Sequence, residues 1–197
     1  FSTYRDLQVS LFNGLTFVVN NADKAQVNGV EVDTAFRATD NLSVSGSLTY
    51  LDTKYDSYTN APCIIGQTPA EGCVGGYQDL TGVPLQYAAK WSGVFNVDYQ
   101  QPIGGVVAKA HFDVFYSDDM NLSPDNDPHS IQPSFAKINA RIAIADPDDR
   151  WELAIIGKNL TDKITRAYEN DIPGLAGSYQ THVHRGRSFA AQGTVRF

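Results

Sequence analysis

The sequence predicts an all-β fold, an antiparallel transmembrane β-barrel segment of about eight strands. Apolar and polar residues alternate with a period of two through nearly the whole chain, and helical periodicity is almost absent. No apolar run approaches the roughly 18 residues of a membrane-spanning helix. In addition, short and long connections between the alternating segments take turns. Together these features favour strands that cross a bilayer.

The alternation predicts strands at residues 3–12, 26–38, 42–57, 85–100, 106–117, 135–145, 150–160 and 186–197. In the first four, the apolar face carries Leu7, Val9 and Leu11; Val30, Val32 and Phe36; Leu42, Val44, Leu48 and Tyr50; and Trp91, Phe95, Val97 and Tyr99. In the last four it carries Ala108, Ala110, Phe112, Val114 and Tyr116; Ile138, Ala140, Ile142 and Ile144; Trp151, Leu153, Ile155 and Gly157; and Phe189, Ala191, Gly193, Val195 and Phe197. Phe115 breaks the pattern, because it lies among the polar residues of its strand.

The connections sort by length. The links at 39–41, 101–105 and 146–149 are short, and those at 58–84, 118–134 and 161–185 are long. An outer-membrane barrel has short periplasmic turns on one rim and longer extracellular loops on the other. A soluble sandwich also alternates, but it has no reason to sort its loops in this way. We therefore expect the long loops outside the cell.

Aromatic residues gather at the two ends of the strands, on the apolar face. Those at the short-turn ends are Phe36, Tyr99, Trp151 and Phe197, and those towards the long-loop ends are Tyr50, Trp91, Tyr116 and Phe189. Amphipathic rings settle at the two lipid–water interfaces of a bilayer. Strands are enriched in aromatics in any case, but here position and face agree, so we expect two aromatic girdles.

Composition excludes other classes. The formal net charge of -7 argues against nucleic-acid binding, which leaves a basic footprint. Two cysteines are too few for a disulfide-scaffold protein. The chain begins at Phe1 in strand-like sequence, with neither an initiator Met nor a signal peptide. We expect a piece of a longer protein.

Several motifs, in order along the chain, resemble the TonB-dependent receptors. They are Tyr4-Arg5-Asp6-Leu7, Asn21-Ala22 followed by Gly29-Val30-Glu31, Leu48-Thr49-Tyr50-Leu51-Asp52, Gly157-Lys158-Asn159-Leu160-Thr161-Asp162-Lys163, and the closing Val195-Arg196-Phe197. The resemblance implies a barrel of about 22 strands around a plug, with residues 1–197 as its C-terminal part. The plug and the TonB box lie N-terminal in that family, and nothing here resembles either.

The resemblance also implies a function. It is active uptake of a scarce solute across the bacterial outer membrane, with a ferric siderophore as the commonest substrate class. The implied partners are the TonB complex, through the absent plug region, the barrel-assembly machinery, outer-membrane lipid and a small-molecule ligand. We expect no cofactor and no enzymatic activity, since the sequence shows neither a catalytic constellation nor a Gly-rich phosphate loop.

Phe197 is a candidate assembly signal. If the resemblance holds, the assembly machinery reads a last strand with a C-terminal aromatic, which fits strand addition at an exposed edge. The alternative is a lipid-facing aromatic without a signalling role.

Cys63 and Cys73 lie together in the longest loop, which is rich in Gly and Pro. A disulfide would pin a polar loop that has no core of its own, and the cell exterior permits one. The alternatives are two free thiols or a metal pair. No His lies in the loop and the spacing is not that of a zinc site, so we expect the disulfide and no metal.

His182 and His184 form an His-x-His pair in the last long loop. In an extended segment both rings lie on one face, where they could bind a metal complex as ligand. A solvated loop is the simpler interpretation, so they are weak ligand-binding candidates. Two alternatives to the whole assignment remain at this stage: a complete eight-stranded barrel acting as an anchor, adhesin or lipid enzyme, and a soluble all-β binding domain.

Overall fold

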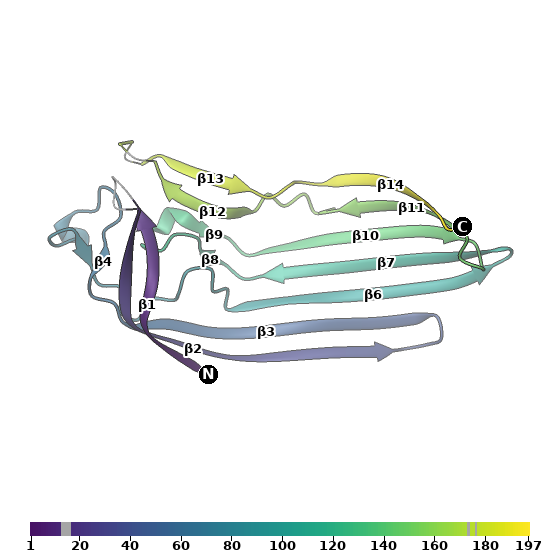
Figure 1. The fold of residues 1–197 in the computed structure, drawn as a ribbon, viewed down its shortest axis with the longest axis horizontal. Coiled ribbons are helices and arrows are strands. Elements are labelled where there is room, and N and C mark those ends of the chain that lie inside the picture. Colours follow the sequence, from purple (N-terminus) through teal and green to yellow (C-terminus); the bar gives the residue numbers. More distant parts are fainter. Residues whose placement is uncertain (13–16, 173, 176) are drawn as a thin grey trace.

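A computed structural model of the protein describes residues 1–12, 17–172, 174–175 and 177–197. Eight long strands form one antiparallel sheet (Figure 1). In sheet order they are β1 (Ser2–Phe12), β2 (Phe17–Arg37), β3 (Leu42–Ser57), β6 (Trp91–Ile103), β7 (Val106–Ser117), β10 (Phe135–Ala145), β11 (Trp151–Lys158) and β14 (Ser188–Val195). β1 and β14 are its two edges, so the sheet is open. The closed eight-stranded alternative needed these two strands to pair.

Short strand pairs and 3-10 turns lie at one end of this sheet. They are the strand pairs β4 (Ala61–Pro62) with β5 (Tyr77–Gln78), β8 (Met120–Asn121) with β9 (Ile131–Gln132) and β12 (Arg166–Asp171) with β13 (Tyr179–Val183), and the 3-10 turns Pro69–Glu71 and Pro128–Ser130. In Figure 1 they lie at the end opposite the short turns. Among the described residues, no helix is long and apolar enough to cross a bilayer.

The all-β prediction and the antiparallel sheet of eight strands are confirmed, but two strand boundaries were wrong. β2 begins at Phe17 rather than residue 26, and β6 begins at Trp91 rather than residue 85. In β2, a register shift between Lys24 and Ala25 reverses the phase of the alternation, so the polar start did not read as strand. Before β6, Tyr87 adopts a left-handed backbone with φ 59°, which interrupts an extended strand.

The turn between β6 and β7 is tighter than expected. The pairing continues to Ile103 opposite Val106, which leaves only Gly104 and Gly105 between the strands. Gly104 has φ 61°, a conformation that glycine adopts without a steric penalty. Two-residue hairpins of this kind favour glycine because their backbone twist matches that of the strands.

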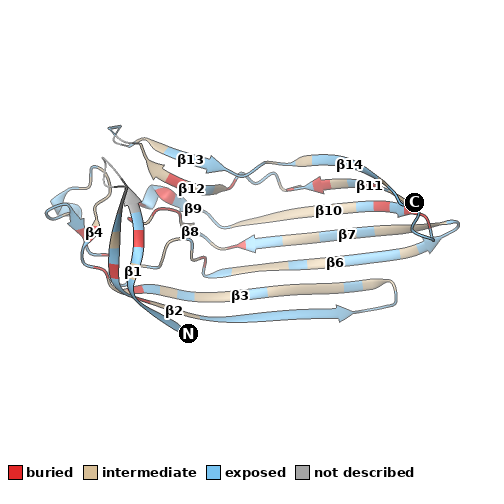
Figure 2. Ribbon diagram, viewed as in Figure 1, coloured by how far each residue is buried: buried red, intermediate tan, exposed pale blue. Residues whose placement is uncertain are grey.

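The two faces of the sheet differ in chemistry. Much of the length of the long strands is exposed (Figure 2). On the apolar face, Ile142 is 68%, Ile155 67% and Phe189 69% accessible. In water, such a contiguous apolar surface would be unstable. On the opposite face, Lys109, Arg141 and Glu152 lie together as ion pairs. An apolar face towards lipid and a polar face towards an interior is the pattern of a membrane barrel wall.

Candidate functional site in the loops and on the polar face

The three long connections form one structure at the end of the sheet opposite the short turns. We call the described residues of 58–90, 118–134 and 159–187 the loop layer. The first connection packs on β1–β3 through a small core of Val9, Ala22, Ala25, Tyr55, Tyr58, Ala61 and Leu80. Burial of Tyr58 raises the pKa of its hydroxyl to about 12. This core anchors a connection that otherwise consists of turns and short strands.

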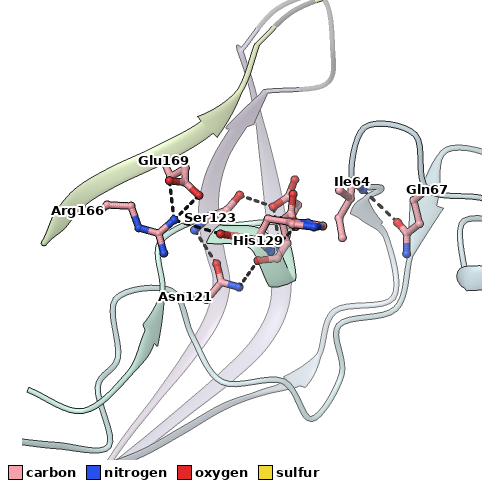
Figure 3. Close-up of polar contacts among 9 residues, drawn as sticks. Ile64, Gln67, Asn121, Ser123, His129, Arg166 and Glu169 are labelled. Carbon is pink, nitrogen blue, oxygen red and sulfur yellow. Dashed lines mark hydrogen bonds and ion pairs between the residues drawn. The ribbon is translucent and has the colours of Figure 1, made fainter. Parts of the chain in front are cut away.

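A disulfide lies in the first connection. It joins Cys63 to Cys73, with a Cα–Cα separation of 5.6 Å. The turn that it encloses is also held by Gln67, whose side-chain oxygen accepts from the amide of Ile64 at 3.1 Å (Figure 3). At Thr68 a capping box with Glu71 starts the 3-10 turn, and those hydrogen bonds lower the pKa of the Glu71 carboxyl.

Amide side chains join the first connection to the second. The Gln78 amide donates to the carbonyls of Pro62 and Asp125, each at 2.8 Å. Gln86 donates to the carbonyl of Leu122 at 2.7 Å. Gln78 is only 8% exposed, so these hydrogen bonds replace the ones that its amide would otherwise make with water.

The guanidinium of Arg166, held by an ion pair within β12, joins the third connection to the second. Arg166 on β12 binds both oxygens of Glu169 at 2.7 Å, and the same guanidinium donates to the carbonyls of His129, at 3.2 Å, and Ile131 (Figure 3). The Glu169 side chain is only 5% exposed. A charge-assisted pair of this kind is stronger than a neutral hydrogen bond. In addition, the rings of His129 and Tyr179 stack with centroids 5.5 Å apart.

Several carboxylates lie close together at the junction between the second and third connections. Burial, with Asp125 and Asp127 nearby, raises the pKa of Asp171 to about 6. Burial also raises the pKa of Asp125, and burial together with Asp127 raises the pKa of Tyr179 to about 12. Asp127 is 1% exposed and pairs with His129 Nδ1 at 3.0 Å. Among the described residues, no group of three or more His, Cys, Asp or Glu is arranged to hold a metal ion.

Asn159 organises the exit from β11. Its backbone is left-handed, with φ 51°. Its side chain donates to the carbonyls of Lys163 at 3.0 Å and Arg185 at 3.4 Å, and accepts from the Lys163 amide at 3.0 Å. The two ends of the third connection are therefore tied together at one residue. This gives a physical reason for Asn in the motif Gly157–Lys163.

The polar face of the sheet carries its own network towards the short turns. Lys109 contacts Glu152 at 2.9 Å, and His111 lies between Asp98 at 2.8 Å and Asp113 at 3.4 Å. A polar hollow of about 270 Å³ opens beside Arg37, Asp98 and His111. These groups satisfy one another, and we assign no chemistry to them.

Most of the aromatic residues predicted as girdles lie near strand ends, but Tyr50 lies in the middle of β3, seven residues before that strand ends at Ser57. Tyr50 pairs with Trp91 across β3 and β6, with ring centroids 4.8 Å apart. Tyr116 on β7 is opposite Gly93, two residues along β6 from Trp91. At the opposite ends lie Phe36, Tyr99 and Trp151, while Phe189 lies near the loop-end start of β14. From Trp91 to Tyr99 a strand extends about 26 Å. At the usual barrel tilt this spans about 20 Å of membrane, close to the roughly 25 Å of an outer-membrane apolar band.

The other predicted residues are exposed. Phe197 is fully accessible and lies beyond β14. His182 lies on β13, where its ring tilts against Tyr168 with centroids 5.7 Å apart, and His184 follows the strand. Sequence reasoning missed Gln78 and Arg166, because the carbonyls that they bind are distant in the chain, and it missed Glu169, whose role is to hold Arg166. Their only local signal was the presence of charged and amide residues in long loops.

The fold and the loop layer define the class. This is a wall segment of an outer-membrane β-barrel, with loops on one rim, turns on the other and a polar face towards the interior. The family model "TonB dependent receptor-like, beta-barrel" matches residues 1–160, so the chain belongs to that family. Its members are outer-membrane receptors that transport solutes and are not enzymes. Family membership confirms the resemblance and rules out the soluble domain.

Solved receptors share the fold. The ferric yersiniabactin uptake receptor FyuA from Yersinia pestis aligns with TM-score 0.72 and 16% identity, covering 99% of this chain and 26% of its own. The siderophore receptor PiuA from Acinetobacter baumannii aligns with TM-score 0.62 and 20% identity, covering 86% of this chain and 21% of its own. The ferric preacinetobactin receptor BauA from Acinetobacter baumannii gives TM-score 0.60 and 15% identity, covering 98% of this chain and 25% of its own. The chain thus spans about a quarter of these receptors. No curated protein matches it.

Proposed function

We propose that this chain is the C-terminal part of the barrel of a receptor that takes up a ferric siderophore by TonB-dependent active transport. The observation that carries the proposal is the loop layer. Three connections on one rim are joined into a single polar surface by Gln78 and by Arg166, which Glu169 holds in place. A joined surface at the extracellular mouth is suited to hold a solute while the barrel admits it. The siderophore receptors among the structural relatives support this substrate class.

The partners follow from the same proposal. The TonB complex would act through the plug and TonB box, which precede the barrel in this family. Outer-membrane lipid would cover the apolar face between the girdles. The barrel-assembly machinery would read the closing strand, with Phe197 as its aromatic signal. His182 and His184 stay weak candidates for ligand contact, since both are exposed on the third connection.

Uptake of iron tests the proposal directly. Cells lacking the full-length gene should lose uptake of at least one labelled ferric siderophore under iron limitation, and the same loss should follow deletion of TonB. Restoring the gene should restore uptake. A gene deletion that leaves the uptake of every ferric siderophore in a broad panel unchanged would contradict the siderophore assignment. Energised uptake of another solute would then identify the actual substrate.

A further inference from the structure

One aromatic group on the polar face departs from the chemistry around it. Phe115 and Phe135 lie on neighbouring strands with ring centroids 5.8 Å apart. The register places them with Asp113 and Asn139 rather than with the lipid-facing residues, because side chains two positions apart share a face. Phe115 is 41% exposed towards this side. Phe135 is half-buried, and a cross-strand aromatic pair stabilises a sheet only modestly. The exposed ring of Phe115 nevertheless presents an apolar surface on an otherwise polar interior wall.

A cation accompanies the pair. Lys137 is directly opposite Phe115 in the register, and its ammonium lies 5.4 Å from the centroid of the Phe135 ring. It also donates to the Thr165 hydroxyl at 2.6 Å. Among the described residues Lys137 takes part in no ion pair, whereas Lys109 and Arg141 on the same face both bind Glu152. Two of the three ammonium donors remain for an anion.

The group, which we call the aromatic shelf (Phe115, Phe135 and Lys137), lies directly beneath the loop layer. Phe115 is two residues from the loop end of β7, and Phe135 begins β10. Thr165, which binds Lys137, belongs to the third connection. A solute that passes the loops would therefore meet the shelf at the top of the interior wall.

We propose that the aromatic shelf is a binding subsite for a planar aryl group that bears an anionic oxygen, such as a catecholate, phenolate or aryl carboxylate. The proposal rests on the siderophore function above and narrows it to aryl-bearing ferric complexes. The two Phe rings offer offset or edge-to-face contact to an aryl plane. The Lys137 ammonium pairs with the oxygen, and the cation–π contact with Phe135 helps to hold it in place.

Binding to the purified full-length receptor tests the subsite. The probes are two panels of ferric complexes, one of catecholates and phenolates and one of hydroxamates and citrate. We expect the receptor to bind at least one aryl complex, and Lys137→Gln to weaken that binding by about tenfold, a change of about 1.4 kcal/mol. Phe115→Leu should weaken it several-fold, and Lys137→Arg should largely retain it. Phe112→Leu is the matched control, since Phe112 lies on the lipid-facing side of the same strand.

The outcomes separate the subsite from the function. Binding of aryl-free complexes alone, or binding of aryl complexes that Lys137→Gln and Phe115→Leu leave unchanged, overturns the shelf while the siderophore function stands. Equal weakening of both panels also overturns it, because it shows a general disturbance. A lower yield of folded receptor at unchanged affinity identifies the shelf as packing for the plug. Absence of binding to both panels contradicts the proposed function and the subsite with it.

Discussion

At the residue scale, the most informative side chains combine a local constraint with a distant partner. Asn159 is one of them. It tolerates the left-handed backbone better than most residues do, and its amide reaches Lys163 and Arg185 at the same time. The motif around it was visible in the sequence. Its purpose was not, because Arg185 is 26 residues away.

Replacing Asn159 tests this account. Asn159→Ala should open the third connection, since it leaves two carbonyls without their donor at a cost of about 1–3 kcal/mol and keeps a strained backbone. Faster amide exchange at residues 160–165 and 184–187 measures the loss. Asn159→Gly relieves the backbone strain but also lacks the side-chain hydrogen bonds. Its exchange rate should therefore lie between those of the wild type and Asn159→Ala. Unchanged exchange in Asn159→Ala would show that the side chain does not hold the connection.

At the element scale, pairing between long strands was predictable and pairing within loops was not. Apolar residues that face lipid repeat every two positions, so β3 and β7 were predicted within one residue at each end. Elements such as β8 and β9 are two residues long, and their pairing depends on contacts such as that of Tyr87 with Asn121. The aromatic shelf had a sequence signal, the break at Phe115, but only the register joins it to Phe135 and Lys137.

The junction between the second and third connections should respond to pH. Asp171 has a pKa of about 6 in the closed junction, above the ordinary carboxyl range near 4. When the junction is formed, the Asp171 carboxyl therefore keeps its proton to a higher pH than when the junction is open. This contribution to the stability of the junction is lost as the pH rises from about 4 through about 6. Asp125 shifts in the same direction. Acidifying from about pH 7 to about pH 5 should slow exchange in β12 and β13, after correction for the intrinsic rate.

The neighbours of Asp171 define the control for this experiment. They are Asp125, Asp127, His129 and Tyr179. Asp171→Asn should protect β12 and β13 at neutral pH and remove most of the pH effect, because its amide cannot ionise. A pH effect of the same size in Asp171→Asn would assign it to another group, such as Asp125.

The first connection makes a separate prediction. Closing the loop between Cys63 and Cys73 should stabilise it by about 3 kcal/mol through the entropy of the open chain. The double variant Cys63→Ser, Cys73→Ser should be cleaved faster by protease within residues 58–84, while the sheet keeps its heat-modifiable migration in detergent gels. Non-reducing mass mapping should find the two peptides linked. Free thiols on freshly isolated protein would refute the pairing.

At the scale of the whole molecule, the sorting of connections by length determines which end faces the cell exterior. The loop layer and the short turns lie at opposite ends of the same strands (Figure 1). The sequence contained this information because successive connections of an antiparallel wall lie at alternate rims, so a difference in length between the two rims appears as short and long links in turn. The twist of the sheet arises from backbone sterics, which a period-two alternation does not record, so it could not be predicted from the pattern.

Labelling from outside the cell tests this orientation. Single cysteines introduced into the full-length receptor at Val74, Asp119 and Gln180 in the loop layer should react with a membrane-impermeant thiol reagent on intact cells. Cysteines at Asp148 and Gly105 in the short turns should react only after the outer membrane is permeabilised. All five positions are exposed, with Val74 72% accessible and the Asp148 side chain 78%, so a difference in rate reports the membrane rather than burial. Cys63 and Cys73 are joined and add no background, and the receptor without introduced cysteines serves as the blank. Rapid labelling at Asp148, in cells that retain a periplasmic marker, would show that the short turns face the cell exterior. The loop layer would then lie on the periplasmic side and could not be where the ligand is captured.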